Sequence, residues 1–110
     1  QVEEMLSEWL RILKPGGTVA VEWPDLLKLC KFIVDHPESL YSDDKRVKKR
    51  SVAGIYGDIA RYKDPVMLHK WGYSEASMCK LLTNIGFAAA YPTTPLYQKT
   101  EMDSRVVAIK

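Results

Sequence analysis

Two residues have the type and position to act in acid–base chemistry. Asp25 directly follows a short apolar segment, and His69 lies shortly before Ser74, which is expected to cap a helix. A carboxylate or imidazole in such a place can orient a substrate or accept its proton. Each also has a structural alternative, since aspartate often caps a helix and a loop histidine often satisfies a loop carbonyl. Asp25 and His69 are therefore candidate catalytic residues, with both alternatives open.

Four further residues are candidates for substrate binding. Glu22 lies near the end of the apolar segment, and Tyr56, Trp71 and Tyr73 flank an irregular stretch. Aromatic side chains there can line a pocket, but they also commonly pack an insertion against a sheet. Glu22 has the alternative of a solvent-facing strand residue.

The sequence does not favour a metal site. It has two histidines and two cysteines, and neither Cys30 nor Cys79 has a second ligand at metal-binding spacing. Both cysteines fall at apolar helical positions, so we expect reduced, buried thiols. No metal ligand is predicted.

The positive charge is local, because the formal net charge is only +2. Five of the six residues in 45–50 (KRVKKR) are basic. Such a run can contact phosphate or nucleic acid, but a solvated helix face is the commoner explanation, and no aromatic ladder accompanies it. Nucleic acid is not an expected partner.

Hydrophobic spacing predicts the elements that must position these residues. The expected helices are a first one reaching Lys14, Leu26–Asp35, one from Ser42 to about Ala53, and Glu75–Ile85. The expected strands are Thr18–Trp23, Phe87–Tyr91 and Ser104–Ile109, with a break at Pro92–Pro95. Pro15 stops the first helix, and the following Gly16-Gly17 supplies the positive φ common at helix exits.

The turn Leu13-Lys14-Pro15-Gly16-Gly17, followed by a strand and Pro24-Asp25, resembles the helix-to-fifth-strand segment of class I S-adenosylmethionine-dependent methyltransferases. The segments GIYGD (54–58), HKWGYS (69–74) and LLTNIGF (81–87) are similar to a bacterial group of predicted methyltransferases. Asp58 departs from that pattern, where a glycine or glutamine is expected.

The resemblance implies an α/β class and a partial Rossmann-like methyltransferase fold. About three strands are expected, one from the parallel part plus a C-terminal antiparallel hairpin, packed with about four helices. Residues 1–110 are expected to form a single domain, with an irregular insert at about 39–73. Since 110 residues are too few for a seven-stranded domain and Gln1 is not an initiator methionine, we expect a C-terminal fragment.

The family's cofactor is S-adenosylmethionine, but no G-x-G-x-x-G motif is present. We expect no cofactor binding by this chain alone, and the acceptor, for example a small molecule or a glycan, is unknown. The alternative is a noncatalytic interaction or dimerisation module.

The expected partner is a second copy of the chain, because the strand Thr18–Trp23 would lack a neighbour along one edge. The dimer would form through this edge or through the first helix. Without a signal peptide or a membrane-length apolar stretch, a cytoplasmic location is expected.

Overall fold

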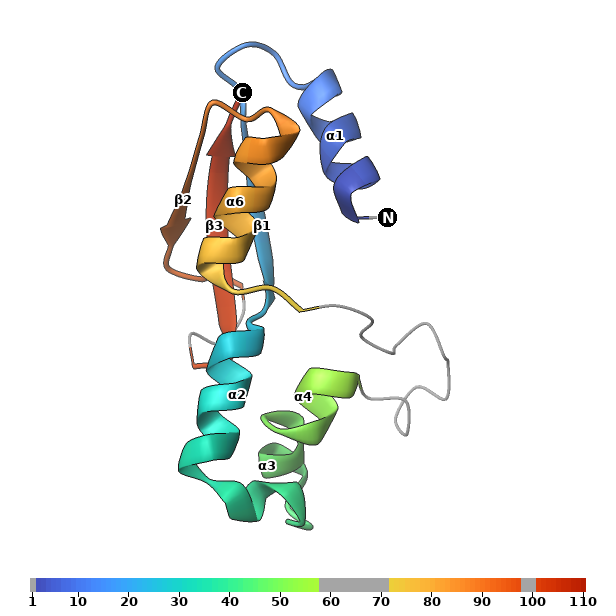
Figure 1. The fold of residues 1–110 in the computed structure, drawn as a ribbon, viewed down its shortest axis with the longest axis vertical. Coiled ribbons are helices and arrows are strands. Elements are labelled where there is room, and N and C mark those ends of the chain that lie inside the picture. Colours follow the sequence, from blue (N-terminus) through green and yellow to red (C-terminus); the bar gives the residue numbers. More distant parts are fainter. Residues whose placement is uncertain (1, 58–71, 98–100) are drawn as a thin grey trace.

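The computed structural model describes residues 2–57, 72–97 and 101–110, which form helices and a three-stranded sheet (Figure 1). The helices are α1 (Val2–Ile12), α2 (Leu26–Asp35), the 3-10 helix η1 (Pro37–Leu40), α3 (Lys45–Lys49), α4 (Val52–Tyr56) and α6 (Glu75–Ile85). The strands are β1 (Thr18–Pro24), β2 (Ala89–Thr93) and β3 (Asp103–Ile109). The predicted mixed α/β class and the expected three strands are confirmed.

The sheet has the order β1-β3-β2. β3 is antiparallel to both neighbours, so β1 and β2 run in the same direction on either side of it. The register pairs Thr18 with Ile109 at one end of β1 and Pro24 with Asp103 at the other. The expected C-terminal hairpin is therefore β2–β3, and β3 places it beside β1.

Helices α1 and α6 pack on one side of the sheet, which we call the covered face. By strand alternation its residues are Val19, Val21, Trp23, Ala90, Pro92, Ser104, Val106 and Ala108. Leu6 of α1 and Leu82 of α6 meet Val106 in one core cluster, and all three are fully buried. The apolar stripes of the two helices thus pack against this face.

The opposite side, which we call the open face, is much less buried. Its residues are Thr18, Ala20, Glu22, Ala89, Tyr91, Thr93, Arg105, Val107 and Ile109. Even in the central strand β3, Val107 and Ile109 are only half-buried, and Tyr91 in β2 is 45% exposed. No helix of residues 2–57, 72–97 or 101–110 contributes to a core on this side.

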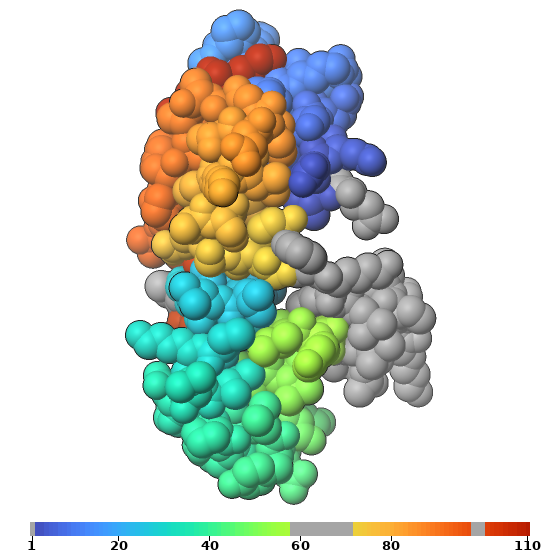
Figure 2. Space-filling view, in the orientation of Figure 1, coloured from blue at the N-terminus to red at the C-terminus, as the bar shows by residue number. Residues whose placement is uncertain are grey.

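Helices α2, α3 and α4, with η1, form a second lobe beyond the carboxyl end of β1, and the start of α2 joins it to the sheet (Figure 1). The surface of this lobe is set apart from that of the sheet and α6 (Figure 2). The molecule is elongated, with extents of 49 × 29 × 22 Å and a radius of gyration of 15.5 Å. A compact domain of this length has a radius of gyration of about 13 Å. The described residues therefore do not close into one compact core.

Most predicted boundaries are close to those observed, but the second strand is shifted. Phe87 is buried in the core and lies before β2, which continues through Pro92 and Thr93. The predicted break at Pro92–Pro95 is therefore wrong at its first two residues. Because β2 is an edge strand, it can accommodate a proline, which has no N–H to donate to a further strand.

Two helix predictions also need correction. The first helix ends at Ile12 rather than Lys14, and the turn after it includes Gly16 at a φ of 78°, which confirms the expected positive φ. The helix expected from Ser42 to about Ala53 is two short helices, α3 and α4. At their junction the Ser51 hydroxyl donates to the carbonyls of Ser39 (3.1 Å) and Val47 (3.2 Å), which competes with regular helix bonding.

None of the described helices is long and apolar enough to span a membrane.

Candidate functional site

Asp25 is buried at the carboxyl end of β1, with 2% exposure. Its Oδ1 accepts the backbone N–H groups of Leu27 (2.8 Å) and Lys28 (3.2 Å), so it caps α2 as predicted. Its backbone N–H donates to the Met102 carbonyl at 2.9 Å. The carboxylate is therefore held rigidly at the point where the sheet meets the second lobe.

The Ser104 hydroxyl connects Asp25 to a second carboxylate. Ser104 is fully buried on the covered face, and its Oγ donates to Asp25 Oδ2 at 2.6 Å. The same Oγ lies 3.2 Å from Oε1 of Glu75, the first residue of α6. Since one hydroxyl has one proton, the short bond to Asp25 holds Ser104 while Glu75 is the looser, second partner.

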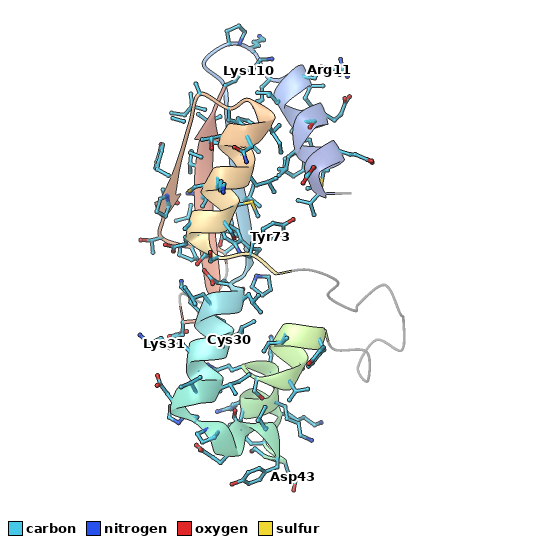
Figure 3. The ribbon with its side chains drawn as sticks, in the orientation of Figure 1. Arg11, Cys30, Lys31, Asp43, Tyr73 and Lys110 are labelled. Atoms are coloured by element: carbon cyan, nitrogen blue, oxygen red, sulfur yellow. The ribbon has the colours of Figure 1, made fainter. Side chains whose placement is uncertain are left out.

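The segment before α6 crosses the end of β1 and brings Glu75 to the site. The Tyr73 carbonyl accepts the backbone N–H of Leu26 at 3.0 Å and the indole N–H of Trp23 at 2.9 Å. Figure 3 shows Tyr73 between the start of α6 and the top of α2. A Cβ on Gly72 would lie 2.7 Å from a Leu26 methyl, so this close crossing requires glycine.

Ser74 then fixes the start of α6. Its Oγ accepts the backbone N–H of Ser77 at 3.2 Å, and the Ser77 hydroxyl accepts the Ser74 N–H at 2.8 Å. This capping box confirms the predicted role of Ser74 and sets the position of Glu75.

A shallow depression of about 260 Å³ lies over these residues. It is lined by Asp25, Leu27, Lys28, Ser74, Glu75 and Ala76. The Lys28 ammonium group donates a hydrogen bond to the Asp103 carbonyl oxygen at 2.6 Å, which holds the Lys28 side chain beside the site. The half-buried Glu75 carboxylate borders this depression and can accept an N–H or O–H from a bound molecule.

Glu22 is not part of this group, because it lies on the open face. Its carboxylate is 3.6 Å from Arg105 Nε, and the two side chains are only 11% and 18% exposed. Arg105 also donates to the Thr93 hydroxyl at 2.9 Å, and the Tyr97 N–H donates to Glu22 at 3.3 Å. The alternative of a solvent-facing residue is therefore wrong, and Glu22 joins the three strands on the open face.

The predicted aromatic residues are not brought together as a pocket by the described structure. Tyr56, at the end of α4, is 64% exposed and does not line the depression beside Asp25 and Glu75. Tyr73 reaches the site through its backbone carbonyl. His69 and Trp71 lie outside the described residues.

The two cysteines differ from the expectation of buried thiols. Cys30 is exposed on α2, so that prediction is wrong. Cys79 is half-buried on α6, where burial raises the pKa of its thiol, and the nearby Glu75 carboxylate raises it further. Within the ranges that the structure describes, no three potential ligands cluster in a way that would hold a metal ion.

The structure reveals two site residues that sequence reasoning missed, Ser104 and Glu75. Ser104 follows the same alternation as the apolar Val106 and Ala108, so a serine facing the core, and needing a partner there, was a readable signal. Glu75 carried no such signal beyond its place in a first helical turn.

Comparison with protein-family models and with curated protein sequences gave no match. The function of the chain is therefore inferred from the geometry of the site and from the sequence motifs.

Proposed function

We propose that this chain is the C-terminal, acceptor-side portion of an S-adenosylmethionine-dependent methyltransferase. The depression at the carboxyl end of β1 is then part of the acceptor site. The acceptor is a small molecule or a glycan with an exchangeable N–H or O–H.

The observation that supports this most strongly is the topology of the sheet. A strand antiparallel to both neighbours separates β1 from β2, as expected for a C-terminal hairpin added to a parallel sheet. Among the described residues, helices cover one face only, whereas a complete doubly wound sheet has helices on both. The open face and the outer edge of β1 are where the remaining strands and helices of such a domain would pack.

The position of the depression is consistent with the same proposal, because ligands of open α/β sheets bind beyond the carboxyl ends of the strands. In this assignment Asp25 positions α2 and Ser104, since both of its oxygens already accept hydrogen bonds. Glu75 is the group that orients the acceptor and takes its proton. The methyl group comes from S-adenosylmethionine, for which this sequence has no glycine-rich G-x-G-x-x-G motif.

Calorimetry and methyl-transfer assays test the proposal. The 110-residue chain is expected to show no saturable binding of S-adenosylmethionine, and the product of the complete reading frame is expected to bind it. In that product Glu75→Gln should lower the transfer rate at least about tenfold. Glu4→Gln, an exposed carboxylate of α1, is the matched control. A complete product that does not bind the cofactor would contradict the proposal.

The open face favours a second candidate, a noncatalytic module that pairs with another copy of itself. Tyr91, Val107 and Ile109 form an apolar surface on the same sheet as the outer edge of β1, and such surfaces commonly mark interaction sites. A homodimer through this edge, or through α1, would bury part of it.

Light scattering at micromolar concentration distinguishes the two candidates. A dimer that Tyr91→Glu converts to monomer supports the second. Tyr41→Glu, at an 80% exposed position at the end of η1 in the second lobe, is the control and should leave the dimer intact. A stable monomer would argue against the dimer.

A further inference from the structure

A second shallow pocket, of about 220 Å³, lies between α2 and the end of α3, and we call it the cavity. Its lining includes four nitrogen-bearing side chains, Lys28, Lys31, His36 and Arg50. Lys31 and the neighbouring Cys30 are labelled on α2 in Figure 3. The binding capacity of this cavity does not depend on the proposed methyltransferase function.

Arg50 is the central residue of this cavity. It is half-buried, and its guanidinium carbon lies 4.1 Å from the centroid of the Phe32 ring. The Phe32 ring in turn lies 5.0 Å from that of His36. Stacking on an aromatic ring engages the flat face of the guanidinium and holds its plane, but it satisfies none of its N–H donors.

Those donors have no acceptor within the described part of the chain. No carboxylate there forms an ion pair with Arg50, and its buried Nε has no hydrogen-bond partner. A partly buried guanidinium in this state is unusual, because desolvated charges are normally paired. The arginine therefore has unused capacity to bind an anion.

Arg50 also differs from the rest of the basic run to which it belongs. Lys45, Arg46, Lys48 and Lys49 are exposed, as expected for a solvated helix face. Arg50 lies at the C-cap of α3, where the chain turns toward Ser51, and its side chain is directed inward against α2. Of the five basic residues in this run, only Arg50 lines the cavity, and the other four are exposed to solvent.

We propose that this cavity binds the phosphate group of a small-molecule ligand. Arg50 supplies a planar, two-pronged donor suited to a phosphate, and Lys31 adds a second cation. His36, whose Nδ1 is 3.3 Å from the Glu38 carboxylate, also lines the cavity.

Two carboxylates limit the charge of the ligand. Asp35 and Glu101 also border the cavity, so its excess positive charge is small. A single phosphate group matches that balance better than a long polyanion, which would be drawn to the exposed basic residues of α3. Lys28 lines both this cavity and the depression at the end of β1.

The proposal is tested by titrating inorganic phosphate into the full chain. Binding is monitored by ¹H–¹⁵N spectra of the arginine side chains. The Arg50 Nε–H signal should shift saturably. Arg50→Gln should weaken phosphate binding at least about tenfold, as expected for the loss of charge-assisted hydrogen bonds. Lys31→Gln should weaken it severalfold, and Asp35→Asn should strengthen it.

Arg46→Gln is the matched control, since it removes one exposed charge from the same basic run. Unchanged phosphate affinity in Arg46→Gln supports the site. Equal weakening by Arg46→Gln and Arg50→Gln would indicate general attraction to α3 and overturn it, as would tighter binding of a single-stranded oligonucleotide that depends on Arg46. If Arg50→Gln loses helical circular dichroism, the Lys31→Gln result decides. The absence of any saturable shift also overturns the proposal.

Discussion

The two faces of the sheet are made from the same three strands but have opposite characters. On the covered face Ser104, Val106 and Ala108 are fully buried beneath α1 and α6. On the open face their neighbours Arg105 and Val107 are half-buried, and Arg105 forms an ion pair with Glu22. The covered face stabilises the chain by excluding water from apolar groups, whereas the open face has polar pairing and unused apolar surface. The difference shows that the core of the described residues lies on one face of the sheet only.

The largest expected contrast comes from truncating an apolar residue on each side. Leu82→Ala removes a fully buried side chain of α6 and should lower the free energy of unfolding by about 2–5 kcal/mol. Val107→Ala, at a half-buried position of the open face, should cost about 1 kcal/mol. Urea denaturation followed by circular dichroism measures both. Equal losses would show that the open face is covered in solution.

A smaller contrast is expected between two hydroxyl residues, one on each face. Ser104→Ala leaves the buried Asp25 Oδ2 without its donor and should cost about 1–3 kcal/mol. Thr93→Val removes an acceptor that serves Arg105 on the open face, and should cost under about 1 kcal/mol. The same denaturation experiment compares the two variants. A larger loss of unfolding free energy for Thr93→Val than for Ser104→Ala would contradict the conclusion that the covered face contributes more to stability.

The ion pair of the open face should contribute less still. A double-mutant cycle with Glu22→Gln and Arg105→Gln is expected to give a coupling free energy of about 1 kcal/mol, because the 3.6 Å separation is longer than that of a strong charge-assisted hydrogen bond. Added salt should reduce that coupling. A coupling of several kcal/mol, unaffected by salt, would mean that a partner shields this face.

The smallest effect concerns the thiol of α6. Burial, with the Glu75 charge, raises the Cys79 pKa, so less thiolate forms at a given pH and alkylation should be slower than at the exposed Cys30. Because the folded protein favours the protonated thiol, this stability contribution is present below the ordinary thiol pKa and is lost as the pH rises through the raised value. Mass spectrometry of alkylated peptides from about pH 7 to 10 measures the rates around the ordinary thiol pKa. Faster reaction at Cys79 would contradict this expectation.

The candidate site is only partly readable from the sequence. Asp25 can be found because it follows a strand and opens a helix, and the structure confirms its place there. Ser104 lies 79 residues from Asp25 and 29 residues from Glu75 along the chain, separations that no local pattern encodes. Glu22 is near Asp25 in sequence, but strand alternation directs it to the other face.

Local chemistry determined the elements themselves. The apolar spacing of α1 and α6, the caps Asp25 and Ser74 and the glycine turn at Gly16 act within a few residues, so the sequence alone was sufficient to predict them. Strand order, the division into a covered and an open face, and the inward turn of Arg50 onto Phe32 depended on contacts between distant segments. Only the tertiary structure decided these, because the free energy of burial depends on which surfaces meet and not on the order of residues along the chain.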